Sequence, residues 1–121
     1  MSSGEDPARQ RQFYRAPVAF PVSARIGEED ADVSSDAHDL SGAGIRISME
    51  RELDRGTPLE MRFHLPQGTS EIVAHGYVVL SFFEGASNRY HHGIAFSRIA
   101  SGDREAIVNH IHEIQRRTPG Q

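Results

Sequence analysis

The chain has 121 residues, a formal net charge of -4 and no cysteine. Its length predicts a single domain that can bury a core without disulfide bonds or metal sites as staples. The acidic balance argues against a general DNA- or RNA-binding protein, because such proteins gain affinity by neutralising many phosphates. The absence of cysteine excludes disulfide bonds and thiolate metal ligands and is typical of a reducing cytoplasm.

The apolar segments also indicate a cytoplasmic location. No apolar run approaches the roughly 18 residues that a membrane-spanning helix requires. Residues 1–6 lack the charged and apolar regions of a signal peptide. We therefore expect a cytoplasmic protein without membrane insertion.

Arginines dominate the segment before the first strand pattern. Arg9, Arg11 and Arg15 lie close together, after residues 1–8, which we expect to be a disordered tail. A guanidinium group is a planar fork of five donors that suits phosphates and the O6/N7 edge of guanine. The segment is therefore a candidate anion clamp. A solvated basic arm is the alternative that these residues leave open.

Six stretches of the chain have the alternation or the β-rich composition of strands. They are residues 18–26, 31–40, 45–49, 59–65, 71–83 and 90–97. Pro21 places the first strand at a sheet edge or a bulge, since proline cannot donate a ladder hydrogen bond. Gly42 and Gly44 separate the second strand from the third, and there we expect backbone with positive φ. The last two stretches, joined by residues 85–89, predict a hairpin.

The apolar period changes after residue 102. Ile107, Val108, Ile111 and Ile114 form one stripe of an amphipathic helix, and Pro119 ends it. Short strands followed by one helix predict a mainly β fold. We expect a six-stranded antiparallel (split) β-barrel with a C-terminal α-helix as a lid on one opening.

Seven histidines without cysteine raise the question of a metal site. His91 and His92 are adjacent on a predicted strand and should point to opposite faces. His110 and His112 lie roughly 200° apart on the predicted helix. Because none of the recurring metal-ligand spacings is present, we expect structural or surface roles for the histidines and no bound metal.

A catalytic centre would need side chains that converge in space. His38, Asp39 and Ser41 could serve as base, orienting acid and nucleophile. Neighbours in sequence seldom form a triad, however, and the chain has no Gly-x-Ser-x-Gly elbow. We therefore expect no catalytic residues and no enzymatic activity.

The turn at residues 39–44 is more informative. The Asp39 carboxylate can accept hydrogen bonds from the N1–H and N2–H₂ edge of a guanine. The Ser41 hydroxyl and the amides beside Gly42 and Gly44 can meet a phosphate. A turn whose side chains cap their own backbone is the alternative that the sequence leaves open.

The arginine segment and this turn together resemble the signature of the PilZ domain, the bacterial receptor module for cyclic di-GMP. The signature is Arg-x-x-x-Arg followed later in the chain by Asp/Asn-x-Ser-x-x-Gly. Arg11 and Arg15 match its first part. Asp39, Ser41 and Gly44 match its second part.

Two further segments carry the same resemblance. Residues 93–96 and 103–107 are similar to the family's last strand and to the start of its closing helix. The resemblance runs over residues 9–115. It implies one PilZ domain at residues 9–117, between the tail at the N-terminus and a short tail at 118–121.

The resemblance implies that the domain binds cyclic di-GMP, which carries two phosphates and two guanines. Arg11 and Arg15 would bind phosphates and guanine O6/N7, or stack on a base. Asp39 would accept hydrogen bonds from the edge of a guanine. Ser41 and Gly44 would complete the pocket on the outer wall of the barrel. Binding is expected to order the arginine segment.

Further ligand contacts are expected from Arg9, Gln10 and Gly42. Many family members carry an arginine at the position of Gln10. In the family, that position helps to decide whether one cyclic di-GMP or a stacked pair is bound. The stoichiometry is therefore left open by the resemblance.

The function implied is that of a receptor and adaptor that relays the signal to an unidentified downstream protein, in processes such as motility or biofilm control. Cyclic di-GMP is then a ligand, and no cofactor is expected. The alternative is a PilZ-like protein–protein interaction module that does not bind cyclic di-GMP. Members of that kind usually lack the arginines or the Asp/Ser turn, and this chain has both.

Overall fold

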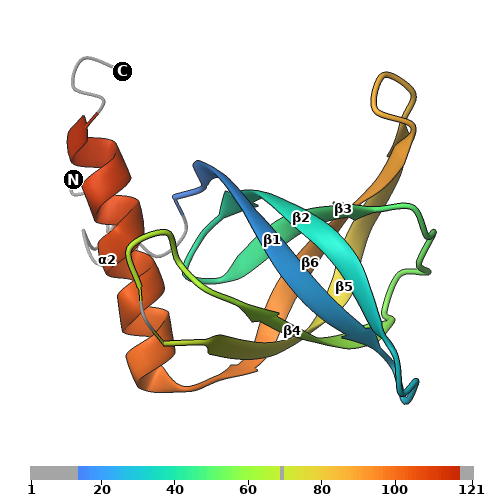
Figure 1. Ribbon diagram of the computed structural model, residues 1–121, viewed down its shortest axis with the longest axis horizontal. Helices are drawn as coiled ribbons and strands as arrows, with labels where there is room; N and C mark the ends of the chain where they lie inside the picture. The colour runs from blue at the N-terminus through green and yellow to red at the C-terminus, as the bar shows by residue number, and fades with distance from the viewer. Residues whose placement is uncertain (1–13, 69, 118–121) are drawn as a thin grey trace, which may run out of the picture.

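Six antiparallel strands close into a barrel in the computed structural model of the protein, and one helix follows them (Figure 1). The structure describes residues 14–68 and 70–117. The strand order around the barrel is β1-β2-β3-β6-β5-β4. The predicted fold is therefore confirmed. The elements are β1 (Ala16–Ile26), β2 (Asp32–Leu40), β3 (Gly44–Met49), β4 (Pro58–Phe63), β5 (Ile72–Glu84), β6 (Arg89–Ile99) and α2 (Ser101–Arg117).

The strand boundaries differ from the predicted ones where pairing, and not the hydrophobic pattern, sets the end. β4 ends at Phe63, two residues before the alternation does. β6 continues to Ile99 because it stays paired with β5 there, with Ile99 opposite Ala74. The hairpin of β5 and β6 is confirmed and extends beyond the rest of the barrel (Figure 1).

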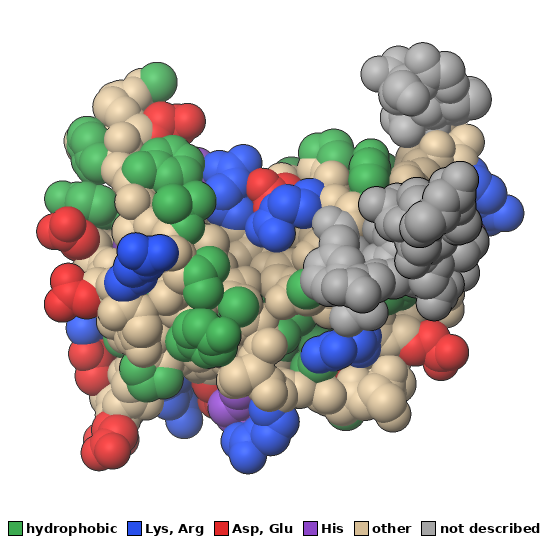
Figure 2. All heavy atoms as spheres, turned by 180° about the vertical axis from the view of Figure 1, so that it is seen from behind, with side chains coloured by type: hydrophobic (Ala, Val, Ile, Leu, Met, Phe, Trp, Pro, Cys, Tyr) green, Lys and Arg blue, Asp and Glu red, His purple; other side chains and the backbone are tan. Residues whose placement is uncertain are grey.

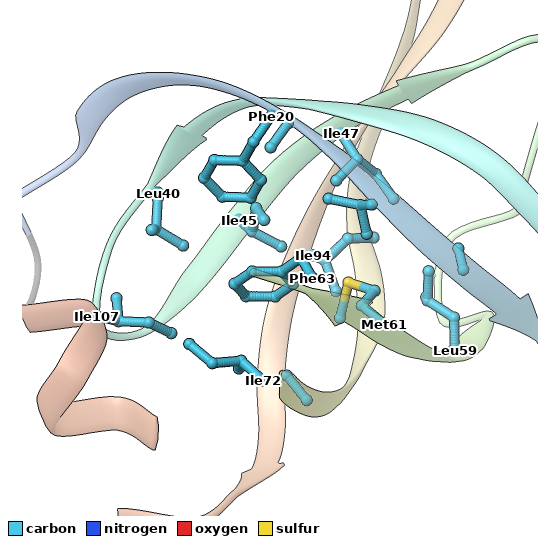
Figure 3. Packing of buried hydrophobic residues seen from close by; sticks show 14 of the residues in the cluster. Phe20, Leu40, Ile45, Ile47, Leu59, Met61, Phe63, Ile72, Ile94 and Ile107 are labelled. Carbon is cyan, nitrogen blue, oxygen red and sulfur yellow. The ribbon is translucent and has the colours of Figure 1, made fainter. Parts of the chain in front are cut away.

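The core fills the barrel because alternate residues of each strand point inwards. Phe20 and Phe63 stack inside it with ring centroids 5.3 Å apart (Figure 3). From the helix, Ile107 and Ile111 are 0% and 1% exposed. Each buried side chain of this size stabilises the fold by roughly 1.5–3 kcal/mol. The stripe predicted for α2 thus attaches the helix to one end of the barrel (Figure 1).

Pro21 lies in the half of β1 that is not paired with β4. β1 pairs with β4 only from Ser23 to Ile26, so the first half of β1 is paired with β2 alone. A proline there removes no hydrogen bond to β4, because that side of the strand has no β4 partner. The register of β1 and β2 also shifts between Pro17 and Phe20. Of the two alternatives predicted from Pro21, the local edge is present at this residue, whereas the register shift lies just before it.

The prediction of positive φ at Gly42 and Gly44 is wrong. Among the described residues, the glycines with positive φ are Gly27 at 55° and Gly56 at 87°. Gly44 is needed for a different reason: a Cβ at this position would lie 2.2 Å from the carbonyl oxygen of Ile94 on β6. The glycine therefore permits a close approach of β3 to β6.

We expect Gly44→Ala to destabilise the barrel. The added methyl must push the β6 backbone away, and overpacking of this kind typically costs about 1–3 kcal/mol. Urea or thermal unfolding measures the change. Gly85→Ala is the matched control, because a Cβ there meets nothing within 4 Å. Equal unfolding free energies for the two variants would contradict the steric explanation.

Candidate functional site

The turn that joins β2 to β3 is held together by Ser41. Its N–H donates to the Gly44 carbonyl oxygen at 2.8 Å. Its Oγ accepts hydrogen bonds from the N–H groups of Ala43 and Gly44, each at 3.1 Å. Ser41 is only 1% exposed. The hydroxyl therefore supports its own backbone, which is the alternative that the sequence left open for this turn. A ligand contact through this side chain stays a prediction.

Asp39 lies beside this turn, between two guanidinium groups. Arg15 contacts Oδ1 with Nε at 2.9 Å and Nη2 at 2.8 Å. Arg46 donates from Nε to Oδ2 at 2.7 Å. The Asp39 side chain is 20% exposed, so the carboxylate is accessible from the outside of the barrel. Each oxygen of this carboxylate therefore contacts one guanidinium group.

Strand register brings these three residues together. Arg15 immediately precedes β1, and in the sheet Pro17 lies opposite Asp39. Asp39 in turn lies opposite Arg46 of β3. The last arginine of the first motif and the first residue of the second motif are thus in contact.

Arg46 and His91 were not among the predicted site residues. Nη1 of Arg46 lies 2.6 Å from Nδ1 of His91. The His91 ring is stacked on Phe82 at 5.1 Å and lies 4.8 Å from the ring of His38. The outward position of Arg46 in the β3 alternation was visible in the sequence. Its contacts with Asp39 and His91 depend on β2–β3 and β3–β6 register, which the sequence does not contain.

The two adjacent histidines of β6 have different surroundings, as their predicted opposite orientations require. His91 contacts Arg46 at the site. His92 is 0% exposed, with Nδ1 2.8 Å from the Ser81 hydroxyl and Nε2 2.9 Å from the carbonyl oxygen of Arg51. His92 therefore has the structural role that the sequence predicted for the histidines.

The family model of the PilZ domain matches residues 9–113. The chain belongs to the PilZ domain family. The described part of that match contains the contact between Arg15 and Asp39. Comparison with curated proteins gives no match.

Solved structures share this fold at low sequence identity. The inhibitor of motility of Bacillus subtilis (MotI/DgrA) has a TM-score of 0.77 and 21% identity, over 87% of this chain and 51% of that one. The PilZ domain of YcgR from Escherichia coli, solved with c-di-GMP, has a TM-score of 0.61 and 13% identity, over 86% and 90%. The PilZ domain of CeSA from a cellulose-synthesizing bacterium has 0.60 and 16%, over 84% and 98%. This chain therefore spans about half of the length of MotI/DgrA.

The other predicted ligand-binding residues lie partly inside and partly outside the described residues. Gly42 is buried within the turn, and Gly44 begins β3. Arg9, Gln10 and Arg11 lie outside the described residues. Their predicted ligand contacts, and most of the segment expected to become ordered on binding, stay predictions.

Within residues 14–68 and 70–117, no three histidine, aspartate or glutamate side chains gather in a way that could hold a metal ion. The helix in this part of the PilZ domain is neither long nor apolar enough to span a bilayer.

Burial lowers the pKa of His38, and the nearby His91 ring and Arg46 guanidinium lower it further. The Nε2 of His38 lies 2.7 Å from the Ser48 hydroxyl. A lowered pKa means that the folded state disfavours the protonated ring relative to the unfolded chain, where the pKa is about 6.5. Protonation of His38 therefore destabilises the fold.

We expect the PilZ domain to lose stability as the pH falls below about 6.5. His38→Gln should show a smaller loss, because one histidine with a lowered pKa has been removed. Part of the loss should remain, since burial also lowers the pKa of His110. Thermal unfolding of both proteins from pH 8 to pH 5 provides the test. Parallel curves would show that His38 makes no contribution.

Proposed function

We propose that this protein is a cyclic di-GMP receptor that relays the presence of the dinucleotide to a partner protein. The ligand would bind through the Arg11–Arg15 segment and the Asp39–Gly44 turn. The PilZ domain is a receptor family for this ligand, which supports the proposal. The observation that carries it is the contact of Arg15 with Asp39, two residues that are 24 positions apart in the chain.

The chemistry of the site suits a ligand with guanines and phosphates. The carboxylate of Asp39 has lone pairs beyond those that face Arg15 and Arg46, so it can also accept hydrogen bonds from a guanine edge. The side chain of Arg15 is 48% exposed, and its guanidinium is within reach of a ligand phosphate. Base and phosphate could thus be bound by neighbouring residues.

The ion pair of Arg15 with Asp39 does not prevent binding. An exposed pair of this kind contributes at most about 1 kcal/mol. A charge-assisted hydrogen bond from the arginine to a phosphate contributes about 1.5–3 kcal/mol. Exchange of the carboxylate for a phosphate is therefore favourable, and Arg15 can turn to the ligand while Arg46 continues to hold Asp39.

The relay to a partner is the second part of the proposal, and exposed apolar side chains on the two faces of β5 support it. Five large apolar side chains there are exposed by 39% to 54%. All five belong to β5, and hydrophobic side chains gather on its protruding end in Figure 2. Exposed apolar patches often mark contact sites for other proteins. The residues are Tyr77, Val79, Leu80, Phe82 and Phe83.

We place this receptor in the cytoplasm, with a role in processes such as motility or biofilm control. The ligand is the signal, and no cofactor is part of the proposal. The alternative is an interaction module that has the fold but no affinity for cyclic di-GMP. The arms of the binding experiment below distinguish the two.

Isothermal titration with cyclic di-GMP should show binding to the wild-type protein and report the stoichiometry. We expect Arg15→Ala to weaken binding at least ~10-fold, since the loss of one charge-assisted hydrogen bond corresponds to about one decade. Arg11→Lys should also bind the ligand weakly, because lysine keeps the charge of arginine but loses its planar fork of donors. Arg25→Ala is the matched control, since Arg25 pairs with Asp32 at the other end of β1 and its loss should leave the affinity unchanged.

The absence of any heat signal from wild-type protein at ~100 μM ligand would refute the receptor function, because contacts of the expected strength register at that concentration. The interaction module would then be the better description.

Asp39 should determine the base. We expect Asp39→Ala to lose affinity for cyclic di-GMP, and wild-type protein to bind cyclic di-AMP poorly. Adenine presents N1 as an acceptor where guanine presents N1–H, so the carboxylate would face a lone pair. Competition titrations with the two dinucleotides measure this preference. Equal affinities would mean that the pocket recognises phosphates alone.

A further inference from the structure

His91 is a buried titratable side chain that the proposed ligand contacts do not use. It is 2% exposed and lies on β6, behind the Arg46 that holds Asp39. Its Nε2 is buried and has no hydrogen-bond partner within the described residues. The nearest acceptor is Oε1 of Glu84 on β5, at 3.4 Å.

The contact with Arg46 assigns the protonation state of this ring. A guanidinium group has five donors and no acceptor. Because Nη1 of Arg46 lies 2.6 Å from Nδ1 of His91, that nitrogen must be the acceptor. The ring is then neutral, with its proton on Nε2 and directed towards Glu84. Stacking on Phe82 at an interplanar angle of 11° fixes the plane in which both nitrogens lie.

Arg46 is consequently held at two points. Nε donates to Oδ2 of Asp39 at 2.7 Å, and Nη1 donates to His91. A long side chain with one contact can adopt several rotamers, and fixing it costs entropy. The second contact, to a ring that is itself buried, selects the rotamer that places Nε against the carboxylate.

We propose that His91 is a positioning residue for base recognition: its neutral imidazole orients Arg46, and Arg46 orients the carboxylate that reads guanine. The inference rests on the proposed function, and it adds a residue that does not itself contact the ligand. His91 acts through Arg46 and leaves the phosphate contacts of Arg15 unchanged.

Protonation of His91 reverses this effect. Nδ1 then becomes a donor that faces a guanidinium, and two positive groups oppose each other at close range. The charged and titratable groups around the ring are Arg46 on β3, His38 on β2 and Glu84 on β5. A protonated ring therefore releases Arg46 from its orienting position.

Titration of cyclic di-GMP into His91 variants from pH 8 to pH 5.5 tests the proposal. We expect His91→Phe, which keeps the stacking on Phe82 and removes the acceptor, to weaken binding about tenfold at pH 8. His91→Asn places an amide oxygen near the position of Nδ1 and should restore most of the affinity. Its affinity should also fall less on acidification than that of the wild type. If His91→Phe does not fold, the pH profile of His91→Asn carries the test.

A measurement without ligand provides a second check. Nitrogen-15 NMR of the imidazoles should show the Nε2–H tautomer for His91 at pH 8. The Nδ1–H tautomer would overturn the proposal, and so would unchanged affinity in His91→Phe together with a wild-type pH profile in His91→Asn. A wild-type protein without affinity for cyclic di-GMP would instead refute the proposed function, and the positioning role with it.

Discussion

One row of paired residues crosses the barrel and holds the site together. Pro17 of β1 lies opposite Asp39 of β2, Asp39 opposite Arg46 of β3, and Arg46 opposite Gly93 of β6. The same row reaches Leu80 of β5. Antiparallel register is the constraint here, because a shift by one residue would turn each of these side chains to the other face of the sheet. The closed barrel fixes that register from both sides.

The site is built from charges that are paired and yet accessible. The Asp39 carboxylate forms ion pairs with the guanidinium groups of Arg15 and Arg46, so that neither its charge nor theirs is left unpaired. Contacts of this kind at a surface are weak enough to exchange with a ligand. Arg46 differs from Arg15 in having a second, buried partner in His91. The carboxylate thus has one exchangeable cation and one fixed cation.

The same imidazole links the site to the β5–β6 hairpin. The ring of Phe82 covers His91, and Phe82 is itself 43% exposed on the apolar surface of β5. The proposed ligand site and the proposed partner surface therefore have a buried side chain between them. A bound ligand would act on the neighbouring surface over this short distance.

The sequence determined the fold class of this protein. The period of two in its strands, the change to a helical period after residue 102 and the two PilZ motifs were sufficient for the barrel, the closing helix and the ligand hypothesis, because these signals are local. Arg15 and Asp39 could be named in advance for the same reason. Some local signals were misleading: Gly44 suggested positive φ, whereas the β6 backbone requires it as a glycine. Only the tertiary structure places Arg46 and His91 beside Asp39, since the contact between Arg46 and His91 joins residues that are 45 positions apart in the chain. Pairing between distant strands has no periodicity in the sequence, and it is settled only when the barrel closes.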